Sequence, residues 1–128
     1  MLQLTSTITE NATIEIGLRD IEVPKPGADE VLIEVQASPI NPSDLGTLVG
    51  AGDLTSIRVE GEGDQAKVIM DIPESVMWAM KPRIGKPLPV GNEGSGIVTE
   101  AGQNAKHLIG KVVSAVGGGM YAQYRGLP

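Results

Sequence analysis

The chain has 128 residues, the size of one domain, and 41% of them are hydrophobic, which is enough for a buried core. Its net charge of −6 comes without a cluster of Lys and Arg, so the composition argues against partners such as nucleic acid or anionic membranes. The absence of Cys excludes disulfides, thiolate catalysis and Cys-based zinc sites, and with one Trp, two Tyr and no Phe the core must be aliphatic.

The first third of the chain favours β structure. Alternating apolar residues and a run of β-branched residues predict three strands, over 2–8, 13–23 and 30–40. The second strand places Ile14 and Ile16 on one face. A stretch with two prolines and a glycine, residues 24–30, separates the second strand from the third.

The stretch NPSDLGTLVGAG, residues 41–52, predicts a short helix. Asn41 or Ser43 can cap its first turn, Pro42 cannot continue a strand, and Asp44 suits the positive end of the helix dipole. Three glycines in the same stretch keep the helix short.

Residues 57–71 predict a β-hairpin with GEGD at its turn. The acidic run EGEGD, residues 60–64, lacks the spaced ligands and the closing Glu of a calcium loop, so it indicates a solvated turn.

A short amphipathic helix is expected next, with Asp71 as its cap, Pro73 in its first turn and Pro82 at its end. Its apolar face carries Ile72, Val76 and Met80.

Three further strands are expected after residue 88, over 95–102, 111–118 and 120–126. Closely spaced strands with turn residues between them and little helix predict a mainly β fold, a small barrel or sandwich.

Three stretches together resemble a known family. EVLIEVQASPINPSDL, PVGNEGSGIVTEAG and GKVVSAVGGGMYAQY resemble, in that order, the N-terminal GroES-like catalytic domain of the medium-chain dehydrogenase/reductase superfamily. The sequence is most similar to its zinc-independent quinone oxidoreductase and enoyl reductase branch, over about residues 1–52 and 88–126. The resemblance implies a GroES-like, partly open β barrel with short helices, spanning residues 1–128.

The resemblance also implies hydride transfer from NADPH or NADH to a small-molecule substrate, a quinone, an enone or a related activated C=C or C=O. The family binds its cofactor on a Rossmann domain, but no G-x-G-x-x-G follows a strand here, and GAGDLT has Thr55 where the third glycine belongs. We therefore expect a chain that stops before the Rossmann domain, with an exposed sheet edge, no tightly bound cofactor and no activity alone. The alternatives are a free-standing GroES-like module with a binding or scaffolding role and, less favoured, a co-chaperone ring.

Three residues are candidates for catalysis: Asn41, Asp44 and Glu93. The resemblance places Asn41 at the cleft, near the nicotinamide or the substrate carbonyl, and Asp44 in the same motif. A plain helix cap explains both residues equally well. The resemblance places Glu93 under the active site, where it orients the catalytic groups; the alternative is a surface acid in a turn.

No metal is expected. Zinc-dependent relatives have Cys and His where this sequence has Asn41 and Asn92, and neutral amides are poor zinc ligands. Some enoyl reductases place a proton-donating Tyr eight residues after the motif Asp, where this chain has Gly52. Tyr121 or Tyr124 could substitute only by facing the cleft, and His107, alone in a loop, is expected to be a surface residue.

The connection over residues 53–87 is longer than the family's. We consider three roles for it: a flap over the cleft, an oligomer contact through Met77, Trp78 and Met80, or packing on the barrel. By family analogy a homodimer is possible. Because the N-terminus lacks a signal-peptide pattern and no segment is long and apolar enough to span a bilayer, we expect a cytoplasmic protein.

Overall fold

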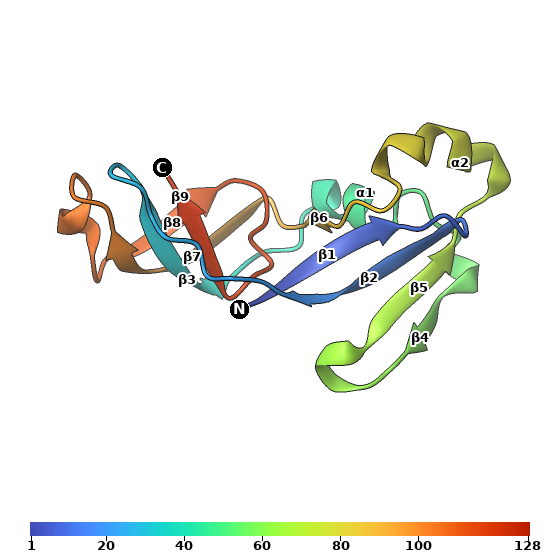
Figure 1. Ribbon diagram of the computed structural model, residues 1–128, viewed down its shortest axis with the longest axis horizontal. Helices are drawn as coiled ribbons and strands as arrows, with labels where there is room; N and C mark the ends of the chain where they lie inside the picture. The colour runs from blue at the N-terminus through green and yellow to red at the C-terminus, as the bar shows by residue number, and fades with distance from the viewer.

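The computed structural model describes residues 1–128 as two antiparallel sheets placed at opposite ends of the long axis (Figure 1). Sheet A has the strand order β4-β5-β2-β1-β6 and sheet B the order β8-β7-β3-β9. The strands are β1 (Leu2–Ile8), β2 (Thr13–Asp20), β3 (Val31–Ala37), β4 (Arg58–Glu60), β5 (Lys67–Asp71), β6 (Leu88–Pro89), β7 (Glu93–Ala101), β8 (Val112–Val116) and β9 (Tyr124–Leu127). The α-helices are α1 (Pro42–Val49) and α2 (Glu74–Met80), and four short 3-10 turns lie at 54–56, 63–65, 81–83 and 106–108.

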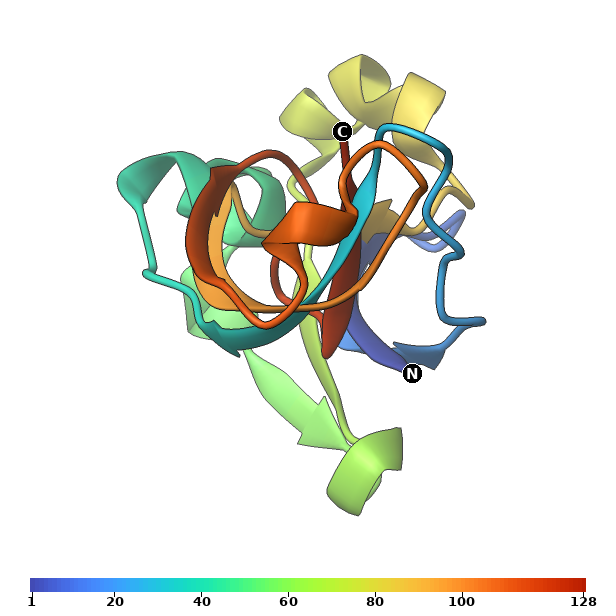
Figure 2. The ribbon, with the colours of Figure 1, turned by 90° about the vertical axis from the view of Figure 1, so that its left-hand side faces the viewer.

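The mainly β fold class is confirmed, and the sheets do not close into a barrel. Each strand expected from the sequence has a counterpart, although the last one begins only at Tyr124, and β6 was not expected. End-on, sheet B is strongly curved and the β4–β5 hairpin projects away from the body (Figure 2). None of the helices is long and apolar enough to cross a membrane.

The core of sheet A is built largely by the long connection, residues 53–87. Ile8 and Ile14 are fully buried against Met70, also fully buried, and Ile72. Three residues of α2 pack on this cluster: Val76, Met77 and Met80. The apolar face expected for this helix is therefore confirmed. The strand β5 hydrogen-bonds to β2 along its length, which makes the connection an integral part of the sheet.

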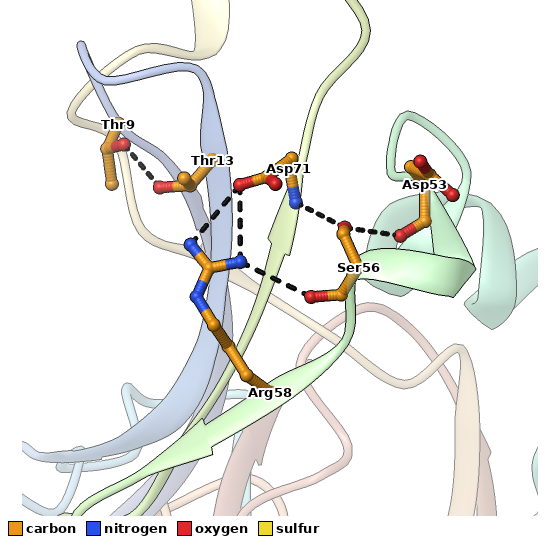
Figure 3. A network of polar contacts seen from close by, with 6 residues as sticks. All are labelled: Thr9, Thr13, Asp53, Ser56, Arg58 and Asp71. Atoms are coloured by element: carbon orange, nitrogen blue, oxygen red, sulfur yellow. Dashed lines mark hydrogen bonds and ion pairs between the residues drawn. The ribbon is translucent and has the colours of Figure 1, made fainter.

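Asp71 does not cap α2, contrary to the sequence prediction; Pro73 occupies the cap position. Asp71 is instead the last residue of β5, and its carboxylate pairs with Arg58 at 3.2 Å (Figure 3). Its backbone N–H donates to Ser56 Oγ at 2.8 Å, and Ser56 Oγ donates to the Asp53 carbonyl at 2.6 Å. These contacts hold the base of the expected hairpin, and because they are solvent-exposed the ion pair itself contributes little stability.

Sheet B has a separate core around Val31, Ile33, Val98 and Ala105. The pleat of β8 turns Val113 and Ala115 onto this cluster. Gly96 allows β3 and β7 to approach closely, since a Cβ at this position would clash with the Glu34 carbonyl and come within 2.8 Å of Ile33 Cγ2.

The two sheets are joined where residues 120–123 run beside the start of β1. Leu4 N–H donates to the Tyr121 carbonyl at 2.8 Å, and Gln123 N–H donates to the Leu2 carbonyl at 3.1 Å. The same residues bring the Tyr121 hydroxyl to Asp44 in the first turn of α1, where the candidate site forms.

Candidate functional site

The start of α1 meets the start of β7, and this junction brings the three candidate residues together. Asn41 is the N-cap residue of α1, with extended backbone, and its side-chain amide donates to Glu93 Oε1 at 3.2 Å. Asp44, in the first turn, accepts the Asn41 backbone N–H at 2.8 Å. Asn41 therefore occupies the cap position that the sequence predicts, and Asp44 accepts its backbone N–H, while the Asn41 side-chain amide is turned toward Glu93.

Asp44 is the most deeply placed of the three, with only 1% of its surface exposed. Its Oδ2 accepts both the Asn41 N–H and the Tyr121 hydroxyl, the latter at 3.0 Å. Its Oδ1 is buried without a partner in the protein. A carboxylate this buried would be costly if left alone, and its two hydrogen bonds offset part of that cost.

Tyr121 links the site to the junction between the sheets. Its hydroxyl lies 3.0 Å from both Asp44 Oδ2 and the Pro39 carbonyl oxygen, although a phenol carries one hydrogen to donate. Burial, the hydrogen bond to Asp44 and the negative charge of that carboxylate raise the pKa of the Tyr121 phenol. The phenol oxygen thus lies between the Asp44 carboxylate and the Pro39 carbonyl and contacts both.

The glycine-rich run before β7 lets the backbone at Gly91 come close to Tyr121. Gly91 has φ +100°, and a Cβ there would lie 2.7 Å from Tyr121 Cδ1 and from the Tyr121 backbone nitrogen. The Gly91 carbonyl accepts from Met120 N–H at 3.1 Å. Glycine is required at this position because the left-handed backbone and the contact with Tyr121 leave no room for a side chain.

Asn41 and Asn92, the two asparagines that the sequence resemblance aligns with zinc ligands, both make hydrogen bonds within the protein. Asn92 Nδ2 donates to Ser43 Oγ at 2.7 Å, while Asn41 donates to Glu93. No group of three or more His, Cys, Asp or Glu side chains lies close enough to hold a metal ion.

A hollow of about 520 Å³ opens beside this cluster, with Glu93 on its wall. Three serine hydroxyls contribute to its lining, from Ser38, Ser95 and Ser114, and no cationic side chain does. The complete lining is Ala37, Ser38, Pro39, Glu93, Gly94, Ser95 and Ser114. A wall of small residues with a few serines, one carboxylate and no cationic side chain fits a neutral group and does not fit a diphosphate, which needs cationic groups or free backbone N–H groups.

The other residues weighed from the sequence lie elsewhere. Tyr124 lines a different hollow, with Arg125 and Gly119, so only Tyr121 reaches the cluster. His107 is exposed on a 3-10 turn, as the sequence predicts. The sequence did not single out the three serines, because small polar residues in or next to strands carry no signal until the exposed face is known.

No protein-family model and no curated protein sequence matches the chain. Solved structures share its fold. A mycobacterial protein determined in complex with NADPH is 18% identical, with a TM-score of 0.57, over 100% of this chain. A candidate NADPH:quinone reductase from Mesorhizobium loti is 24% identical, with a TM-score of 0.55, over 98% of this chain. The chain spans only 30% and 33% of the lengths of these two proteins.

Proposed function

We propose that this chain is the substrate-side, GroES-like domain of a zinc-independent, NAD(P)H-dependent oxidoreductase of the medium-chain family. Its substrate would be a quinone, an enone or a related activated C=C or C=O. The observation that carries the proposal is the Asn41 amide, which donates to Glu93, a residue on the wall of a hollow that has no cationic side chain. The shared fold with an NADPH-bound protein and with a candidate quinone reductase supports it.

Asn41 is the residue suited to contact a substrate oxygen. Its amide nitrogen carries two hydrogens, and the protein accepts one of them through Glu93. The second can donate to a carbonyl oxygen, on which negative charge develops as hydride is added to the conjugated system. A preorganised donor stabilises that charge because it need not reorient during the reaction.

Glu93, Asp44 and Tyr121 are positioning residues in this proposal. Glu93 fixes the orientation of the amide, and Asp44 fixes the Asn41 backbone, since it accepts that residue's N–H while Tyr121 restrains the carboxylate. Together they set the direction of the free amide hydrogen.

The hydride would come from NADPH or NADH, and the residues present do not fit the diphosphate of that cofactor. The hollow has no cationic side chain, and both sheets are antiparallel, so the chain has no strand–glycine-turn–helix unit of the dinucleotide-binding type. We infer that a further domain of a longer protein holds the cofactor, in line with the third of each related structure that this chain spans.

Titrations of the isotope-labelled chain, followed by amide NMR, test the proposal. With 1,4-naphthoquinone we expect weak, saturable shifts centred on Asn41, Glu93 and Ser95, reduced in Asn41→Ala and unchanged in the matched surface variant Asn104→Ala. With NADPH alone we expect no tight binding. Quinone shifts scattered over the surface would contradict the substrate-side assignment, and micromolar NADPH binding would contradict the need for a second domain.

A free-standing binding or scaffolding module remains the second candidate. The observation in its favour is the amount of exposed apolar surface, which includes Trp78, Val112 and Val116. Such a module would respond to neither the quinone nor NADPH in these titrations.

A further inference from the structure

The strand β8 is an open edge of sheet B. It pairs with β7 on one side and has no strand on the other. Val98 N–H donates to the Lys111 carbonyl, and Gly117 N–H donates to the Asn92 carbonyl. The backbone N–H and C=O groups of the odd-numbered residues in 111–117 therefore point toward β7. Because hydrogen bonding alternates along an antiparallel strand, the backbone N–H and C=O groups of Val112, Ser114 and Val116 point outward.

The side chains of the same residues lie on the uncovered face of the sheet. Val112 is 78% exposed and Val116 is 84% exposed, whereas Val113 and Ala115 pack on the core. Ile97, directly across from Val112 on β7, is itself partly exposed and extends this apolar surface. An exposed strand face is ordinarily polar, so two largely exposed valines at its ends require an explanation.

The other sheet edges carry features that prevent pairing. The edge strand β4 has Arg58 and Glu60, and β9 has Arg125. The edge strand β6 is two residues long and ends in Pro89. Charges, prolines and short length are the usual ways in which proteins protect an open edge. The five residues of β8 have none of these protections.

We propose that β8 is a self-association edge, at which two copies of this chain pair their β8 strands antiparallel about a two-fold axis at Ser114. In this register Val112 of each copy lies opposite Val116 of the other copy. Ser114 of one copy lies opposite Ser114 of the other. The inference does not depend on the proposed function.

The register follows from the strand itself. A two-fold axis at Ser114 makes Val112, Ser114 and Val116 the hydrogen-bonded positions, and these are the residues whose backbone groups are free. The apolar side chains then meet across the new pair, and no charge within β8 opposes another. A second copy fits this edge better than an unrelated strand because the pattern Val-x-Ser-x-Val is the same when read from the opposite direction.

The contact also reaches the candidate site. Ser114 lines the hollow beside Glu93, so the two-fold axis sets the hollows of the two copies side by side. One short strand pair buries less than the roughly 1,000 Å² expected of a stable interface, so the dimer is a weak one that dissociates on dilution.

Sedimentation equilibrium over a range of chain concentrations tests the proposal. The wild type should shift reversibly from the mass of one chain toward twice that mass. The double variant Val112→Lys with Val116→Lys sets like charges opposite each other and should weaken association by about tenfold or more. Both positions are largely exposed, so the fold should be retained, which far-UV circular dichroism checks.

A charge-paired variant tests the register. Val112→Lys with Val116→Glu places each Lys opposite a Glu of the other copy, so association should return and should weaken with added salt. Val59→Lys on β4 and Trp78→Ala on α2 are matched controls at exposed apolar positions outside β8, and both should associate as the wild type does.

Three results would overturn the inference. The first is a wild type that remains a single chain at millimolar concentration. The second is a Lys/Lys variant that associates as the wild type does, or a Trp78→Ala variant that does not associate, either of which would place the contact elsewhere. The third is a Lys/Glu variant that remains as dissociated as Lys/Lys, which would exclude the two-fold register at Ser114.

Discussion

Sheets A and B differ in what they contribute: sheet A holds a fully buried core, and the candidate functional site lies at one end of sheet B. Sheet A owes its fully buried core to residues distant in sequence, with Ile8 and Ile14 packed on Met70. Sheet B has a similar small core, but its end near α1 holds the buried carboxylate Asp44, the hollow and an open edge. The four buried residues at the centre of sheet A are all apolar, whereas the site end of sheet B carries the hollow and the unprotected edge of β8.

The long connection belongs to the first half. Met70 and Ile72 are buried in the sheet A core, so residues 67–72 are structural, as the packing hypothesis expected. Deleting residues 54–86 would remove β5 and half of this core, so loss of the fold would obscure any effect on a flap or an oligomer contact. Those two hypotheses stay predictions for the exposed face of α2, where Trp78 is 72% exposed.

The largest effect should come from the sheet A core. Met70→Ala removes a fully buried side chain, and we expect the free energy of unfolding to fall by about 2–5 kcal/mol. Urea denaturation measures it, and Val59→Ala, at an exposed position of the neighbouring β4, should change it by less than about 0.5 kcal/mol. A small effect of Met70→Ala would mean that the connection does not build the core.

A smaller loss should come from the site. Asp44→Ala leaves the Asn41 N–H and the Tyr121 hydroxyl without their shared acceptor, which should cost about 1–3 kcal/mol. Hydrogen exchange at the Asn41 amide should accelerate, whereas Asp64→Ala, an exposed acid in the hairpin turn, should change neither quantity. Unchanged exchange at Asn41 would show that Asp44 does not hold the α1 start.

The smallest effect should be seen in alkaline solution. The variant Tyr124→Phe leaves Tyr121 as the one tyrosine, so its absorbance can be titrated alone. The Tyr121 pKa should lie above the ordinary 10.0, and adding Asp44→Asn should lower it toward that value. Because the pKa is raised in the folded state, the stability linked to this proton is complete below pH 10.0 and is lost as the pH rises through the folded pKa. Tyr121→Phe should lack this part of the alkaline loss; an identical pH profile would contradict the contact.

Local sequence patterns predicted most of the elements. Alternation located β1 and β2, a run of β-branched residues located β3, and the helix-start chemistry at Asn41 located α1, because all three signals depend on neighbouring residues. The prediction that Asp71 caps α2 was wrong, because Asp71 is the last residue of β5 and the helix begins only at Glu74. Strand pairing with β2 decided this position over the local capping pattern. The start of β9 was also misplaced, because residues 120–123 bond to β1, which is distant in sequence.

For the site, the sequence supplied Asn41, Asp44 and Glu93 as candidates, and the fold brought them into one hydrogen-bonded cluster. Tyr121 was considered as a proton donor, and its contact with Asp44 gives it a positioning role that residues 77 positions apart cannot reveal in sequence. The serine wall of the hollow depends on which face of each strand is uncovered.

The sequence by itself determined the elements, their order and the mainly β class, because period, turn residues and caps act over a few neighbouring residues. Only the tertiary structure decided that the long connection is core, that Tyr121 restrains Asp44, and that β8 is an open apolar edge. Those properties arise from strand pairing between distant segments, and pairing selects which side chains are buried, which polar groups meet and which backbone groups remain free.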